Sequence, residues 1–254
     1  MSSANAEAEA EAMLSSSSAA VSTRALSSAG GAAAMASEAD QAVMLACMAS
    51  EADQAVMLAA MASGADKKVV LAAVAQNGYV LRYVPAEFRA DYEVVFAAVA
   101  QNGWALQYAS KDLRADKEVV LAGMANFGGA LAYAPEMLQA DKEVVLAAVA
   151  QTGAALYFTT KALQADKEVV LTAVAQNGYA LRYASKDLQA DKEVVLAAVA
   201  NFGGALAYAP EMLQADKEFV LAAVAQNGNA RFYAAVHLRS DKEVVLAAES
   251  ERED

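Results

Sequence analysis

An Asp residue recurs every 25 residues along most of this chain, and this repeat limits the possible folds more than any other feature. The repeated positions are Asp66, Asp91, Asp116, Asp141, Asp166, Asp191, Asp216 and Asp241. Gly follows twelve residues after each of the first seven, and an aromatic residue follows five residues after that Gly. Periods of roughly 20–50 residues indicate solenoids and related tandem arrays. We therefore expect one structural module for each 25 residues.

The first half of each module is predicted to be a helix of about three turns. Asp is a strong N-cap, and the Lys-Glu that follows places an acid in the first turn, where the helix dipole favours it. The next residues carry an apolar face at helical spacing, as in Val144, Val145, Ala148 and Val149. A buried strand is the rival interpretation of such a run, but the high Ala content and the bracketing Asp and Gly favour helix. The Gly is typical of a left-handed helix end.

The second half of each module is predicted to contain two shorter helical pieces. All three Pro residues, Pro85, Pro135 and Pro210, fall at one position of the repeat. A Pro disfavours helical geometry in the residue before it, so the stretch after the Gly is not one helix. One module has too few large apolar side chains to offset the entropy of ordering 25 residues. The modules must therefore stack, which predicts an all-α solenoid.

The repeat also predicts the organisation of the whole chain. Residues 66–248 form the array, and residues 35–65, which repeat every thirteen residues, are expected to form two short Met/Ala-rich helices that cap it. Residues 1–34 are a Ser/Ala/Glu-rich segment of low complexity that we expect to be disordered. Residues 249–254 form an acidic C-terminal tail, because Glu249 stands where the other long helices carry Val or Met.

Charge and composition exclude several classes of partner. The net charge is −12, but residues 66–248 hold 17 basic and 20 acidic residues, a difference of −3. Each repeated Lys has an acid beside it, so no basic stripe for nucleic acid is expected. No apolar run approaches the ~20 residues that span a bilayer, and no targeting signal is visible. One Cys, Cys47, allows a reducing compartment. We expect an intracellular protein, cytoplasmic or nuclear.

The repeated motif resembles a known family. The signature D-K-E-V-V-L-A-A-V-x-Q-N-G-x-A-L-x-Y-A-S-x-x-L is similar to a repeat family known only as a domain of unknown function, number 4116 in its naming series. The resemblance extends from Asp66 to about Ala248. It implies tandem short helical repeats, and it implies no activity and no catalytic residues. Some modules depart from the pattern, with NFGG at Asn126–Gly129 and at Asn201–Gly204, and NARF at Asn229–Phe232.

Residues capable of catalysis are few. The single His, His237, stands at a solvent-tolerant position of the repeat, and we expect an exposed side chain there. Cys47 stands where the related helices have Ala, which favours a small buried residue over a reactive thiol. The recurring acids are explained by capping and the helix dipole rather than by calcium binding. We therefore expect no catalytic activity, no metal and no cofactor.

The favoured function is a protein-protein interaction scaffold that acts as a monomer. The position four residues after each Gly varies most between modules, and variable positions of repeat proteins lie on the surface. Tyr79 with Arg82, and Tyr179 with Arg182, are helical neighbours that would form aromatic–basic pairs there. The predicted partner-binding residues are Tyr79, Arg82, Trp104, Gln107, Tyr157, Tyr179, Arg182 and Phe232. The alternatives are a small-molecule or lipid carrier with an inter-helix groove, and an enzyme with an unrecognised site.

Overall fold

The computed structural model of the chain describes residues 67–250. The expected tail at 1–34, the expected capping helices at 35–65 and residues 251–254 lie outside the described residues. Contacts divide the chain after Pro135 into two compact units, so that unit 1 holds the described residues 67–135 and unit 2 holds residues 136–250. Each unit is described separately.

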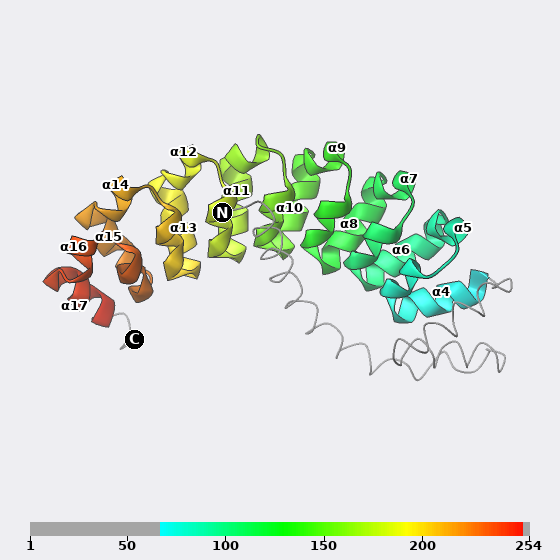
Figure 1. The fold of residues 1–254 in the computed structure, drawn as a ribbon, viewed down its shortest axis with the longest axis horizontal. Helices are drawn as coiled ribbons and strands as arrows, with labels where there is room; N and C mark the ends of the chain where they lie inside the picture. Colours follow the sequence, from blue (N-terminus) through cyan, green and yellow to red (C-terminus); the bar gives the residue numbers. More distant parts are fainter. Residues whose placement is uncertain (1–66, 251–254) are drawn as a thin grey trace. The chain divides into compact units, whose positions relative to one another are not determined.

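Unit 1 contains eight helical segments in its described part. They are α4 (Lys67–Gln76), η2 (Gly78–Arg82), α5 (Ala86–Arg89), α6 (Tyr92–Gln101), η3 (Gly103–Tyr108), α7 (Lys111–Arg114), α8 (Lys117–Asn126) and η4 (Gly128–Tyr133), where η marks a 3-10 helix. The long helix α6 packs between α4 and α8, and each 3-10 helix packs against the next one along the chain (Figure 1).

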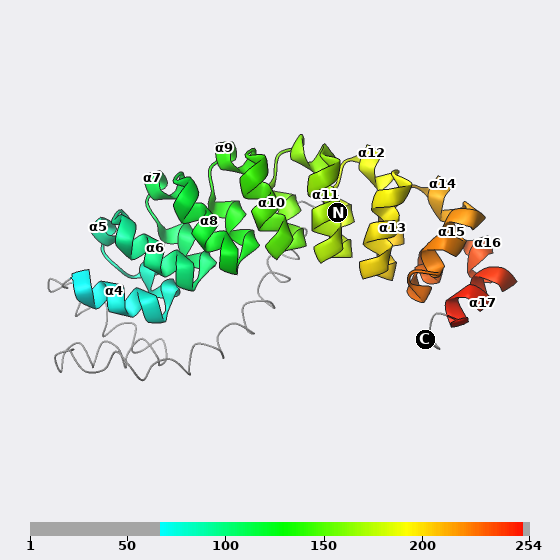
Figure 2. The same cartoon turned by 180° about the vertical axis from the view of Figure 1, so that it is seen from behind.

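Unit 2 repeats the same arrangement. Its elements are α9 (Glu136–Gln139), α10 (Lys142–Gln151), η5 (Gly153–Phe158), η6 (Leu163–Ala165), α11 (Lys167–Gln176), η7 (Gly178–Tyr183), α12 (Lys186–Gln189), α13 (Lys192–Asn201), η8 (Gly203–Tyr208), α14 (Glu211–Gln214), α15 (Lys217–Val224), η9 (Gly228–Tyr233), α16 (Val236–Arg239) and α17 (Lys242–Ser250). The long helices α10, α11, α13, α15 and α17 each pack against the next in chain order (Figure 2).

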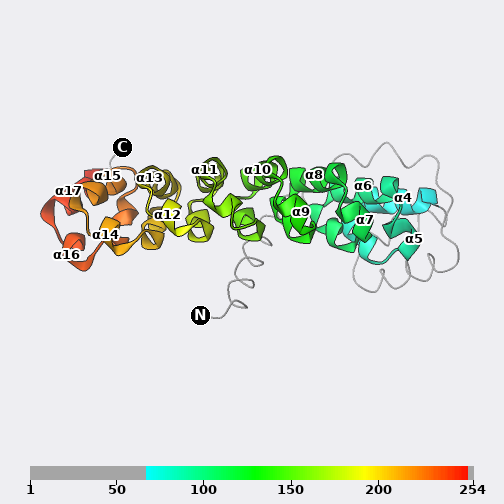
Figure 3. The ribbon, with the colours of Figure 1, turned by 90° about the horizontal axis from the view of Figure 1, so that it is seen from above.

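Within each unit the long and the short helices lie in separate rows. In Figure 3 the long helices α11, α13 and α15 lie along one side of unit 2, and the short helices α12, α14 and α16 lie along the other. Residues 67–250 contain no strand. The all-α solenoid of 25-residue modules is therefore confirmed, with one long helix and two short pieces in each module, and the first short piece is a 3-10 helix.

From Asp91 to Asp241, the Asp that marks each module caps its long helix. The Asp141 carboxylate accepts hydrogen bonds from the backbone N–H groups of Glu143 and Val144, at 3.0 and 3.3 Å. Asp166 and Asp191 cap α11 and α13 in the same way. These bonds satisfy donors that have no partner inside the helix. The Val residues that follow are completely buried between neighbouring long helices, so the cap also fixes which face of the helix enters the core.

The Gly after each long helix has a different role from the predicted one. Gly78, Gly103, Gly153 and Gly178 do not have the positive φ of a left-handed helix end, so that prediction was wrong. The long helices α6, α8, α10, α11 and α13 end instead at an extended residue, as at Asn177 with φ −150° and ψ 107°. The Gly is needed because two backbones approach closely. A Cβ atom on Gly178 would lie 2.2 Å from the carbonyl oxygen of Ala198 in the next module.

The Gln two residues before the Gly connects neighbouring modules, and the Asn between them caps the following 3-10 helix. The Gln176 side-chain oxygen accepts a hydrogen bond from the backbone N–H of Gly153, at 2.6 Å, in the preceding module. Asn177 caps its own 3-10 helix by accepting from the N–H of Tyr179 at 3.0 Å. In unit 1, Gln101 bonds Gly78 in the same way. The Gln-Asn-Gly motif is therefore a joint between stacked modules.

Ion pairs also connect successive modules along the long helices. Lys142 contacts Asp166 at 2.7 Å and Glu168 at 2.8 Å, which are the N-cap and first-turn acids of the next module. Lys167 makes the same pair of contacts with Asp191 and Glu193. In unit 1, Lys67 pairs with the corresponding acids. The Lys-Glu of the motif thus supports the stacking as well as the helix dipole.

These ion pairs predict how stability depends on pH. The hydrogen bond from Lys142 lowers the pKa of Asp166 below its ordinary 3.8, and the bond to Asp166 raises the pKa of Lys142 above 10.5. The carboxylate contribution is therefore complete above pH 3.8 and is lost as the pH falls through the lowered pKa, because the unfolded chain binds protons first. The Lys contribution is complete below pH 10.5 and is lost as the pH rises through the raised pKa.

We therefore expect the contribution of these ion pairs to the free energy of unfolding to be largest between pH 3.8 and pH 10.5 and to fall on both sides of that range. The measurement is urea unfolding at a series of pH values for the wild type and for a K142Q/K167Q/K217Q variant. The variant removes the Lys partners of three carboxyls whose pKa is lowered. Its free energy of unfolding should therefore decline less steeply below pH 3.8. An equal decline in the two proteins would contradict this assignment.

Candidate interaction surface

The 3-10 helices position the side chains that the sequence analysis selected. In a 3-10 helix, residues three apart lie above one another on one face. Tyr79 and Arg82 of η2 have this spacing, as do Tyr179 and Arg182 of η7. The buried Leu81 and Leu181 hold these helices on the core and leave the aromatic side chains partly accessible at the surface.

The structure brings both predicted aromatic–basic pairs together. The Arg82 guanidinium donates a hydrogen bond to the Tyr79 hydroxyl at 3.1 Å, and its carbon lies 6.0 Å from the centre of the Tyr79 ring. Arg182 donates to the Tyr179 hydroxyl in the same manner, and its carbon lies 5.6 Å from that ring. Each guanidinium is therefore held against the Tyr of its own module.

Trp104 and Gln107 of η3 make internal contacts. The Trp104 ring stacks on Phe127 with their centres 4.6 Å apart, and it lies 6.0 Å from the ring of Tyr133. The Gln107 side chain donates to the backbone oxygen of Trp104 at 3.1 Å. Both side chains remain half-buried, so they keep only part of their surface for a partner.

In unit 2 four Tyr side chains form a continuous row, which we call the aromatic row. The Tyr157 ring lies 5.2 Å from Tyr183, the Tyr183 ring lies 6.1 Å from Tyr179, and the Tyr179 ring meets Tyr208 edge-on at 5.4 Å. The row therefore crosses η5, η7 and η8 in three successive modules. The sequence analysis selected Tyr157 and Tyr179 but not Tyr183 or Tyr208, which are the aromatic residues five positions after the module's Gly.

Burial and hydrogen bonding change the acidity of these tyrosines. Burial raises the pKa of Tyr208, and it also raises the pKa of Tyr108 in unit 1. A hydrogen bond with Tyr108, supported by Arg82, lowers the pKa of Tyr79. These half-buried hydroxyls therefore stay protonated in neutral solution and can donate hydrogen bonds.

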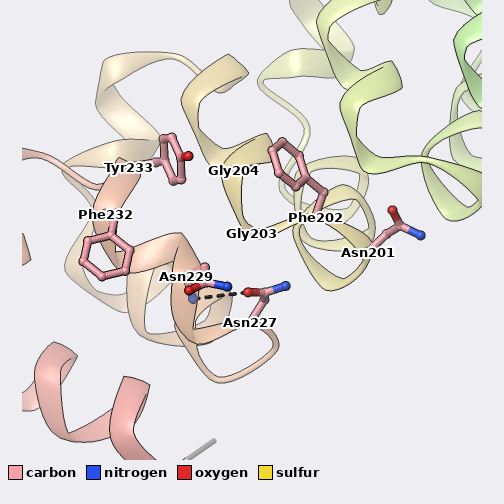
Figure 4. Close-up of a pocket in the computed structure, with 8 residues that line it drawn as sticks. All are labelled: Asn201, Phe202, Gly203, Gly204, Asn227, Asn229, Phe232 and Tyr233. Carbon is pink, nitrogen blue, oxygen red and sulfur yellow. Dashed lines mark hydrogen bonds between the residues drawn. The ribbon is translucent and has the colours of Figure 1, made fainter. Parts of the chain in front are cut away.

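Phe232, the last of the predicted residues, lies on η9 and is 51% exposed. Its ring lies 4.9 Å from the Arg231 guanidinium carbon, and it lines a pocket with Phe202, Gly204 and Tyr233 (Figure 4). The structure does not place Phe232 in the aromatic row through any ring contact among the described residues. The predicted residues thus fall into separate groups on the surface.

Other candidates lie away from this surface. His237 is exposed on α16, while Cys47 lies outside the described residues. Met137 and Met212 are 70% and 75% exposed at the position of the repeat that His237 shares. The sequence analysis did not select them, although a large apolar side chain at a solvent-tolerant position of the repeat indicates an exposed apolar surface. Between residues 67 and 250 no three His, Cys, Asp or Glu side chains are grouped so that they could hold a metal ion.

The helices themselves are short. In the part of the chain that the structure describes, no helix has both the length and the apolar character needed to cross a membrane. The longest helices have ten residues, which corresponds to about 15 Å at the usual rise per residue.

Comparison with known proteins identifies the repeat. Four successive segments match the family model described as Domain of unknown function (DUF4116), at residues 66–114, 116–164, 166–214 and 216–250. Each of the first three segments spans two neighbouring 25-residue modules. No curated protein and no solved structure matches this chain. Because the matched segments cover most of its length, the chain belongs to the DUF4116 family, as the resemblance of its repeated motif predicted.

Proposed function

We propose that this protein is a non-catalytic scaffold that binds a protein partner through its 3-10 helices. The observation that carries the proposal is the row of Tyr side chains in unit 2, which crosses three modules and has Arg182 fixed against Tyr179. Tyr, Trp and Arg are the residues that contribute most to the binding energy of protein interfaces. A fixed and partly exposed set of them is suited to that role.

The arrangement also explains how binding strength would arise. Each module presents only a few accessible side chains, because the remainder of each ring is buried against its neighbours. Binding would therefore depend on several modules together. Replacing one Tyr–Arg pair should weaken the interaction without abolishing the fold, because neither residue belongs to the completely buried Val and Leu core.

The test compares a Y179A/R182A variant with the wild type in affinity capture from a lysate of the source cells. We expect the variant to recover at least about tenfold less of a specific partner, because it removes two interface-type side chains. A matched control, K186A/D187A, changes two exposed residues of the adjacent helix α12 and should recover as much as the wild type. Melting temperatures check that all three proteins are folded. Equal recovery by the three would contradict the proposal.

A further inference from the structure

A pocket of about 360 Å³ opens between η8 and η9 in unit 2, beyond the end of the aromatic row. Its lining residues are Asn201, Phe202, Gly203, Gly204, Asn227, Asn229, Phe232 and Tyr233. None of these side chains carries a charge. In Figure 4 the backbone at Gly204 lies between the side chains of Phe202 and Tyr233.

In two other modules a Tyr ring occupies this place. The residue after the module's Gly is Tyr79 in η2 and Tyr179 in η7, and each ring meets the Tyr of the next module edge-on, with centres 5.4 Å apart. In η8 the corresponding residue is Gly204, which has no side chain. Tyr233, the Tyr of the next module, is therefore left 39% exposed and has no ring partner among the described residues.

Phe202 fills only part of the space that the missing ring leaves. It stands where the preceding module has Asn177, and its ring lies over Gly204, where a Cβ would come within 2.4 Å of the ring tip. The Phe202 side chain is still 40% exposed, and Phe232 on the opposite element is 51% exposed. The remaining volume is large for one ring, since a cavity of about 150 Å³ is enough to hold benzene.

We propose that this pocket binds an aromatic side chain of a partner protein, which takes the place that Tyr179 occupies one module earlier. Edge-on contact with Tyr233 would reproduce the geometry seen between Tyr179 and Tyr208. The segments of this chain outside the structure cannot supply the ring, because residues 1–66 and 251–254 contain no Phe, Tyr or Trp. The uncharged lining, with amide groups of Asn227 and Asn229, suits a neutral ring with a hydroxyl or N–H.

This inference rests on the proposed interaction role, but its test needs no protein partner. The probe is p-cresol, which reproduces the side chain of Tyr, its methyl group standing for the Cβ. It is added to the full-length ¹⁵N-labelled protein, and binding is followed by NMR. We expect saturable shifts of the backbone amides of Gly203, Gly204 and Asn229. The aliphatic analogue 4-methylcyclohexanol, of nearly equal size, should bind about fivefold more weakly, because it lacks the ring contact.

Two variants locate the binding. F202N/G204Y restores the Asn-Gly-Tyr sequence of Asn177–Tyr179 and should close the pocket with the chain's own ring, so that p-cresol no longer binds. Y233L keeps an apolar side chain but removes the ring, and should weaken p-cresol binding about fivefold. The inference is overturned by the absence of saturable shifts in the wild type, or by equal affinity in wild type, Y233L and a folded F202N/G204Y. Such a result leaves the capture test of the aromatic row unaffected.

Discussion

Replacing Gly178 by Ala should lower the free energy of unfolding by about 3 kcal/mol, although it adds a single methyl group. The added Cβ would lie 2.2 Å from the backbone oxygen of Ala198 and 2.9 Å from the Cβ of Phe202. Backbone atoms of a packed helix move only with their neighbours, so the two modules must separate. Separation would also stretch the hydrogen bond from the Gly178 N–H to the Asn201 side chain, now 2.9 Å long.

The same substitution at Gly123 is the matched control. Gly123 lies inside the long helix α8, and a Cβ there would meet the Val99 Cβ at an ordinary 3.5 Å. The corresponding residues Ala98, Ala148 and Ala173 are Ala and are completely buried. Because Gly is a poor residue for a helix interior, Gly123→Ala should raise the free energy of unfolding by about 0.5–1 kcal/mol. Urea unfolding followed by circular dichroism measures both changes, and shifts in the same direction would contradict the joint described here.

Local features of the fold were predictable from the sequence because they depend on a few adjacent residues. The Asp cap of each long helix needs only the three residues that follow it, and the Pro position marks where the second short helix begins. The Tyr179–Arg182 pair was predictable for the same reason, since their spacing places them together in either type of helix. The choice of a 3-10 helix was not predictable, because it depends on how the module fits onto its neighbours.

Features that join modules were missed or misread. The role of Gly178 depends on a carbonyl twenty residues later in the chain, and its spacing from Asp166 suggested a helix end instead. The bonds from Lys142 to Asp166 and Glu168 depend on the register between stacked helices. A strict repeat does contain this information, because residues 24 or 26 apart become neighbours once one module lies on the next. Reading the motif against its own copy, shifted by one module, would have found these contacts.

The candidate surface was predicted only in part. The variable position after the Gly indicated Arg82 and Arg182, but the ring contacts of Tyr183 and Tyr208 depend on packing between modules. The pocket beside Gly204 was signalled by the NFGG departure from the motif. At Gly204 the visible effect of that departure is the loss of one ring from the surface.

The central claim is that each 25-residue module is a unit of stacking, and deletions of different length test it directly. Removing residues 166–190 takes out one whole module and joins Ala165 to Asp191, so that the LQADKE sequence is preserved. In a stack stabilised by neighbours, the shortened protein should lose the contribution of one module and one interface. It should keep its helix content per residue and its cooperative unfolding transition.

Removing only residues 179–190 should cause more damage, although it deletes fewer residues. This segment returns the chain from the end of α11 to the start of α13, and α11 is about 15 Å long. With Gly178 joined directly to Asp191, α13 cannot lie beside α11 in its present direction. Urea unfolding of the two deletion variants, followed by circular dichroism, is the decisive measurement. The account predicts that the 12-residue deletion is the less stable protein, and a more stable 12-residue deletion would contradict it.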